Sequence, residues 1–154
     1  PCLQQKCLIH LIRDMNDDLL KNQFDEEYRQ IVHDFGCLIK SVIMTIDKYG
    51  LKKIHLQKHN RDVEKFYDSL FSHEYRSDIA IKYQWRFKKY QDRLFTFLNH
   101  DDVPWNNNNA EHALKGFAAY RNITDGVFTE NGIKQYLTLF SIYQTCTYKG
   151  VDFL

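Results

Sequence analysis

The stretch DEEYRQIVHDFGCLIKSVIMTIDKYG, residues 25–50, decides the fold class of this chain. Asp25 is suited to cap the start of a helix there, because its carboxylate can accept a hydrogen bond from a first-turn amide. Gly50 is suited to end that helix, since glycine adopts a left-handed backbone without strain. Apolar residues recur between them at intervals of three and four, which predicts one long amphipathic helix. These residues are Tyr28, Ile31, Val32, Phe35, Leu38, Ile39, Val42, Ile43 and Ile46.

The same apolar spacing continues on both sides of this stretch and predicts further helices. Asn60 and Ser77 are placed to cap two of them. Strands are expected to be short at most, one near the N-terminus and one hairpin at residues 123–128, where Asp125-Gly126 signals a turn. The expected fold is therefore mainly α, a helical bundle. The further helices are predicted over residues 8–19, 60–71, 77–97, 108–118 and 133–143.

Size and composition allow one compact domain with a sizeable core, because 44% of the 154 residues are hydrophobic and 15% are aromatic. The net charge of +1 means that a nucleic-acid partner would have to meet a local patch of charge. Apolar runs of only a few residues predict no membrane span. Four scattered cysteines predict free thiols in a reducing compartment, so we expect the cytoplasm.

The residues that could take part in catalysis lie between Pro104 and Lys115, where four asparagines precede a lone carboxylate, Glu111. Asparagine amides both donate and accept hydrogen bonds, so such a cluster can hold a phosphate or orient a carboxylate. Glu111 would project from the first turn of a predicted helix. Asn108 and Glu111 also have the spacing of a capping box, a structural role that needs no catalysis.

This stretch resembles the C-terminal signature of insertion-sequence DDE transposases, which reads Asp-Asn-Asn-x-x-Glu-Arg-x-x-Arg. Asn107, Asn108 and Glu111 match its two asparagines and its glutamate. Lys115 stands where the second arginine is expected. The chain departs from the signature at two positions, where Asn106 replaces the aspartate and His112 replaces the first arginine.

Two further segments carry the resemblance toward both ends of the chain. Tyr120-Arg121-Asn122 resembles the basic step that follows the signature in this family. Cys7-x-x-His10-x-x-Arg13 resembles the segment that follows the second catalytic aspartate, which gives His10 and Arg13 a supporting role. The resemblance thus brackets the chain, although it is weak between these segments.

The resemblance implies an RNase H-like parent domain in which Glu111 and two upstream aspartates bind Mg²⁺ or Mn²⁺ for DNA cleavage and strand transfer. No segment here resembles the strands that carry those aspartates. We therefore expect residues 1–154 to be a single domain, the C-terminal part of the catalytic region. Residues 20–103 would be a helical insertion, and residues 104–154 would carry the third acidic residue. The isolated chain is expected to be inactive and to hold no metal, and the complete enzyme to be a homo-oligomer.

A basic stripe is predicted on the helix that follows Ser77. Its cations follow one another at intervals of four, three and four, so they share one face and could neutralise phosphates of DNA. This stripe consists of Lys82, Arg86, Lys89 and Arg93. The resemblance adds Asn107, Asn108, Lys115 and Arg121 as expected DNA contacts. A stripe of this kind is also typical of an ordinary solvated helix face.

Two other functions are compatible with the sequence. One is a non-catalytic helical module that binds DNA or a partner protein. The other is a metal-binding helical bundle that uses His10, His33 or His112, although no second Cys-His pair has the spacing of a zinc finger.

Overall fold

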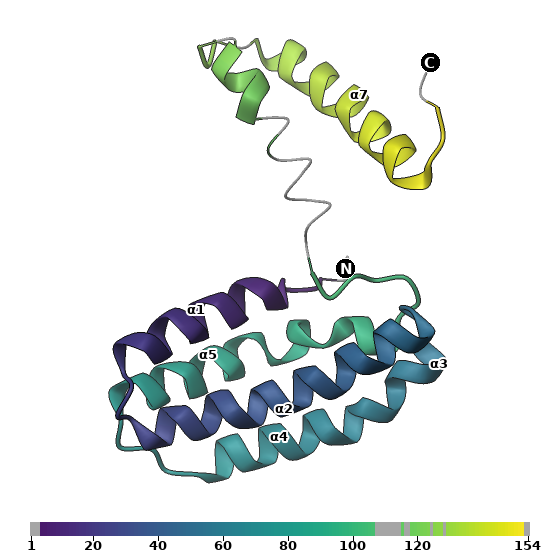
Figure 1. The fold of residues 1–154 in the computed structure, drawn as a ribbon. Coiled ribbons are helices and arrows are strands. Elements are labelled where there is room, and N and C mark those ends of the chain that lie inside the picture. Colours follow the sequence, from purple (N-terminus) through teal and green to yellow (C-terminus); the bar gives the residue numbers. More distant parts are fainter. Residues whose placement is uncertain (1–3, 107–114, 116–117, 124, 128, 153–154) are drawn as a thin grey trace. The chain divides into compact units, whose positions relative to one another are not determined.

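The computed structural model describes residues 4–106, 115, 118–123, 125–127 and 129–152 (Figure 1). Contacts divide the chain into two compact units, Pro1–Asn106 and Asn107–Leu154. All regular secondary structure in the described residues is helical, which confirms the mainly α prediction. The predicted insertion at residues 20–103 stays a prediction, because an insertion is defined by the domain that carries it.

The first unit is a bundle in which α1, α2, α4 and α5 alternate in direction (Figure 1). The central helix is α2, which contacts the three others. Two short elements, α3 and η1, connect α2 to α4, and η2 follows α5. The bounds are α1 Leu8–Lys21, α2 Glu26–Tyr49, α3 Lys53–Leu56, η1 Gln57–His59, α4 Asn60–Ser72, α5 Asp78–Leu94 and η2 Thr96–Asn99.

The core of this bundle is aromatic and is centred on the apolar stripe of α2. The ring of Phe35 lies 5.7 Å from that of Phe66 on α4 and 5.0 Å from that of Phe87 on α5. Tyr28 stacks on Tyr83 at 4.9 Å, and its hydroxyl donates to the carbonyl of Met15 on α1 at 2.9 Å. Burial of these rings stabilises the packing of four helices at once, because each aromatic side chain buries a large area.

Capping residues hold the starts of α2 and α5 together. Asp25 accepts a hydrogen bond from the Tyr28 amide at 2.9 Å, and the Ser77 hydroxyl accepts one from the Ala80 amide at 3.3 Å, as predicted. The Ser77 hydroxyl also donates to Asp25. Glu27 accepts from the amides of Arg76 and Ser77, both at 2.8 Å. At its other end, α2 stops at Gly50, whose φ is 70°.

The prediction that Asn60 caps α4 is wrong. Asn60 is the first residue of the helix, and His59 stands at the capping position without a side-chain hydrogen bond. The side-chain amide of Asn60 instead donates to the side-chain oxygen of Asn99 at 2.9 Å. A tertiary partner 39 residues away along the chain therefore replaces the local capping role that the sequence indicates.

The two ends of the described bundle meet in space. Residues 4–7 have no regular secondary structure, contrary to the short strand that we expected there. The Lys6 amide donates to the Arg93 carbonyl at 2.7 Å, and the Leu8 amide donates to the Trp105 carbonyl at 3.2 Å. The Thr96 hydroxyl adds a bond to the Gln4 carbonyl at 2.9 Å. The chain thus enters and leaves this bundle at one place.

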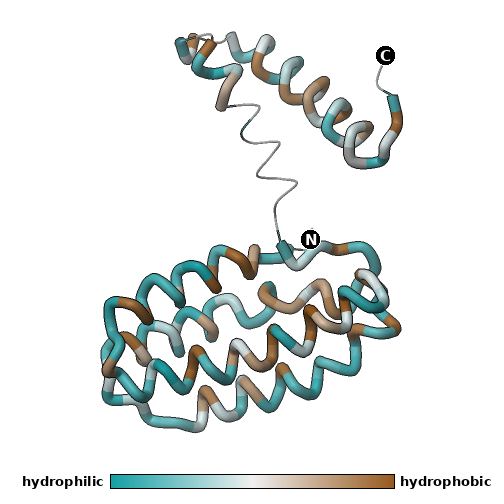
Figure 2. Tube along the Cα trace, viewed as in Figure 1, coloured by the Kyte–Doolittle hydropathy of each residue, from teal (hydrophilic) through white to brown (hydrophobic). Residues whose placement is uncertain are grey.

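The second unit consists, in its described part, of helical residues 115 and 118–123, a turn at Asp125-Gly126 and α7 (Glu130–Lys149). The predicted turn at Asp125-Gly126 is confirmed, but the described residues within 123–128 form no hairpin. Thr129 caps α7 by accepting from the Gly132 amide at 3.1 Å, and Gly150 ends it with a φ of 65°. None of the unit's residues whose burial is described is buried. Hydrophobic residues recur along α7 (Figure 2), and Leu137, Leu139 and Ile142 among them are exposed. No described helix of either unit is sufficiently long and apolar to cross a membrane.

Candidate functional site

The signature residues Asn107, Asn108 and Glu111 lie outside the described residues, so their predicted roles stay predictions. Two residues that were predicted to contact DNA near them are described. Lys115 and Arg121 are both helical, and both have exposed side chains. Their positions are compatible with contacts to a large partner, since neither is covered.

The predicted basic stripe lies on α5, but two of its cations are engaged with α1. Lys82 donates to the Asp18 carboxylate at 2.8 Å, and Arg86 forms an ion pair with Asp14. The hydrogen bond from Lys82 holds the pKa of Asp18 below its usual value. These pairs fix α1 against α5 and locally offset half of the stripe's charge.

The other cations of α5 remain available. Within the described part of the chain, Lys88, Lys89 and Arg93 form no ion pair. Lys88 and Lys89 instead lie against aromatic rings, with each ammonium 5.4 Å from the ring centre of Trp85 or Tyr90, respectively. This arrangement combines exposed positive charge with aromatic surface.

An open hollow of about 640 Å³ lies over this part of α5. We call it the Trp85 surface and define it by its lining, which contains no acidic residue: Lys82, Trp85, Arg86, Lys88, Lys89 and Tyr90. Sequence analysis did not single out Trp85. The signal was nevertheless present, because the lysines at 82, 88 and 89 follow the helical spacing that surrounds residue 85.

The histidines and carboxylates of the described residues do not build a metal centre. No group of three or more His, Cys, Asp or Glu side chains in that part of the chain could hold a metal ion. His10 and Arg13 lie on the exposed side of α1, and His33 is exposed on α2. The hypothesis of a metal-binding bundle built on His10 and His33 is therefore not supported, and His112 lies outside the described residues.

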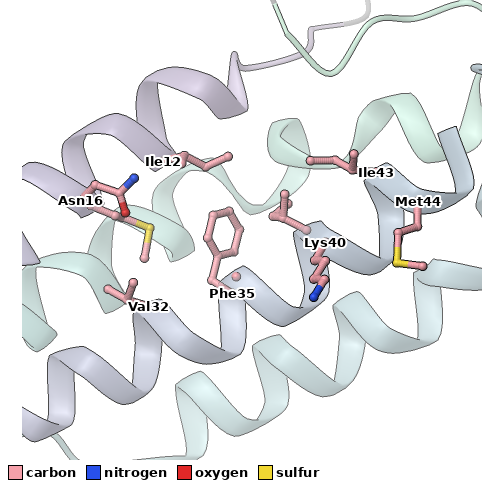
Figure 3. A pocket seen from close by; sticks show the side chains of 10 residues that line it. Ile12, Asn16, Val32, Phe35, Lys40, Ile43 and Met44 are labelled. Carbon is pink, nitrogen blue, oxygen red and sulfur yellow. The ribbon is translucent and has the colours of Figure 1, made fainter. Parts of the chain in front are cut away.

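An apolar hollow of about 390 Å³ lies between α1 and α2 (Figure 3). Ile12, Phe35 and Ile43 form much of its lining, and Asn16 and Lys40 are the polar residues at its edge. It offers no pair of acidic or basic groups for catalysis. We interpret it as a packing feature of the bundle, where α1 covers the face of α2 incompletely.

His59 is a buried titratable residue with a structural role. Its Nε2 lies 2.8 Å from the Thr45 hydroxyl, which donates onward to the Ser41 carbonyl at 3.2 Å. Nδ1 is 3.5 Å from Asp62 and makes no hydrogen bond. Burial lowers the pKa of His59, because the charged imidazolium is poorly solvated there.

The comparison with known protein families defines the class of protein to which these features belong, the transposases of insertion sequences. The matching sequence model is that of the Transposase IS66 family, and it covers residues 1–135. The chain therefore belongs to this family. No curated protein and no solved structure matches the chain. The match spans the bundle, the asparagine cluster, Glu111 and the start of α7.

Proposed function

We propose that this chain is part of a DDE transposase that cleaves and joins DNA, with Glu111 as one of three metal-binding carboxylates. The observation that carries the proposal is the family match across residues 1–135, which includes the signature of Asn107, Asn108 and Glu111. Two aspartates on an RNase H-like sheet of the complete transposase would join Glu111. The helical bundle would be an insertion in that domain.

The residue types fit this chemistry. A pair of Mg²⁺ or Mn²⁺ ions would supply activation of the attacking oxygen and stabilisation of the leaving oxygen. Glu111 offers the carboxylate oxygens that Mg²⁺ prefers. The amides of Asn107 and Asn108 can orient that carboxylate or bind a phosphate, and Lys115 can bind a neighbouring phosphate. One acid of three is not sufficient, so we expect no cleavage by the isolated chain.

DNA binding by the helical bundle is supported by the cations of α5. Lys88, Lys89 and Arg93 are exposed, and none of them is neutralised by a carboxylate in the described part of the chain. Contacts of this kind bind phosphates without reading base sequence. These cations would add DNA contacts outside the catalytic centre, and Arg121 in the second unit would be a further contact of the same kind.

The test of the catalytic role is a Glu111→Gln change in the complete transposase. The amide keeps the size of the side chain but removes its charge, so we expect strand transfer to fall below detection while DNA binding and folding persist. Strand transfer would be measured on labelled transposon-end DNA with Mg²⁺ or Mn²⁺. Glu130→Gln is the matched control, because Glu130 is an exposed acid at the start of α7 that pairs with Lys134.

Normal strand transfer by the Glu111→Gln enzyme would remove Glu111 from the catalytic set. A non-catalytic module that binds DNA would then be the better description. That module would show an affinity for DNA that falls as salt increases, because bound phosphates release counterions.

A further inference from the structure

The position of Trp85 on α5 is unusual for so large an apolar side chain. The inner face of the helix buries Tyr83 and Phe87 completely, whereas Trp85 is 64% exposed on the outer face. Single exposed apolar residues are common and need no explanation by themselves. The residues around the indole distinguish Trp85, because a lysine precedes it by three positions and two follow it by three and four.

The charge of the Trp85 surface favours an anionic ligand. Asp18 and Asp14 on α1 offset Lys82 and Arg86, whereas Lys88 and Lys89 have no such partner in the described residues. The Lys88 ammonium lies 5.4 Å from the centre of the indole ring. A ligand that covers the indole would therefore bring its negative charge directly to these two lysines.

A nucleotide combines the two chemistries that this surface offers, an aromatic base and an anionic phosphate. Base–aromatic stacking and backbone phosphate contacts are the usual means of binding single strands. In the interior of a duplex both faces of each base are covered by neighbouring bases, so an indole can stack there only on a base that has left the helix. The surface thus fits unpaired nucleotides better than it fits a continuous duplex.

We propose that the Trp85 surface binds an unpaired nucleotide at a DNA end, with the base stacked on Trp85 and the phosphates held by Lys88 and Lys89. This deepens the proposed function and rests on it, since DNA is taken as the substrate. The binding itself requires neither metal nor Glu111. Its failure is therefore distinguishable from a failure of the catalytic assignment.

The experiment measures the affinity of the 154-residue chain for two labelled DNAs by fluorescence anisotropy without metal. One is a blunt duplex, and the other is the same duplex with a short single-stranded tail. We expect the tailed DNA to bind about tenfold more tightly, a difference typical of the stacking of one base. Trp85→Ala should abolish the difference, and Trp85→Phe should keep most of it. Phe24→Ala is the matched control, because Phe24 is 95% exposed outside α5.

A second measurement reports on the indole directly. The chain has two tryptophans, so Trp105→Phe leaves Trp85 as the fluorophore, and tailed DNA should quench it more than blunt DNA does. Lys88→Ala and Lys89→Ala should weaken binding of both DNAs and reduce its salt dependence, whereas Lys40→Ala on α2 should not.

Three results would overturn the proposal. The first is equal affinity of the unmodified chain for tailed and blunt DNA. The second is a Trp85→Ala variant that keeps the preference for the tail. The third is quenching of Trp85 by oligoglutamate as strong as that by tailed DNA, which would assign the surface to an acidic protein partner.

Discussion

Gly36 weakens the central helix of the bundle. It lies on the exposed side of α2, and a Cβ atom added there would meet nothing within 4 Å. Glycine in a helix interior loses more backbone entropy on folding than alanine does. We therefore expect Gly36→Ala to raise the free energy of unfolding by about 0.5–1 kcal/mol. Urea denaturation followed by circular dichroism would measure the change.

Gly50 provides the control for this prediction. It also has open space around its Cβ position, but its φ is 70°, a conformation that L side chains rarely adopt. Gly50→Ala should therefore lower the stability by roughly 1 kcal/mol. The same sign for both variants would show that open space alone, and not backbone conformation, decides the effect.

His59 makes stability depend on pH below neutrality. Its pKa is lowered in the folded chain, so the unfolded chain takes up the proton first as pH falls below the usual value of 6.5. The stability contributed by neutral His59 is fully present above pH 6.5 and is lost as pH falls toward the folded-state pKa. We expect the urea midpoint to decrease between pH 7.5 and pH 5.5.

His59→Gln should make that decrease shallower, because glutamine does not titrate. His100→Gln is the control, since His100 is exposed after η2. A midpoint whose pH dependence is unchanged in the His59→Gln variant would assign the effect to other groups.

The starts of α2 and α5 act as one capping network, through the hydrogen bond from Ser77 to Asp25. Asp25→Ala and Ser77→Ala each remove a helix cap and should each lower stability by about 1 kcal/mol. Their effects should not add, since either change also removes the shared bond. A double-mutant cycle should show a coupling of at least about 0.5 kcal/mol. Asp25→Ala combined with Thr129→Ala, the cap of α7, should be additive.

The helices and several of their ends could be predicted because their causes are local. Apolar spacing over a few turns located α2, and the residues at its ends, Asp25 and Gly50, act on neighbouring residues, as does the cap at Ser77. The role of Asn60 could not be predicted, because its side-chain amide donates a hydrogen bond to Asn99 across the bundle. No helix was predicted over residues 51–59, yet they contain the short elements α3 and η1 for a similar reason. Leu56 is buried in the core there, so tertiary packing sets the local backbone.

The candidate site was predictable only in part for the same reason. Helical spacing placed Lys82 and Arg86 on one face of α5, as the structure shows. It could not reveal that Asp18 and Asp14, 64 and 72 residues earlier, would partner them. Helical spacing alone does not predict that Trp85 is exposed, because aromatic residues in helices are usually part of a core.

The two units of the whole chain differ in how they bury apolar residues. The first has a continuous core to which its main helices contribute, whereas the second exposes Leu137, Leu139 and Ile142 along α7. The overall hydrophobic content of 44% does not distinguish these situations. It therefore predicts that a core exists but not which part of the chain holds it.

The meeting of the bundle's two ends has a consequence for any domain that carries it. While the bundle is folded, the backbone hydrogen bonds at Lys6 and Leu8 keep the entering and leaving segments together, so a domain that carried the bundle as the proposed insertion would be interrupted by only a small gap. Unfolding would convert the bundle into a flexible loop of about a hundred residues. Holding the two ends of such a loop together costs on the order of 4 kcal/mol of chain entropy. If the bundle is an insertion, as proposed, substitutions deep in its core would loosen the host domain entropically even where they leave the residues that would bind DNA or metal unchanged.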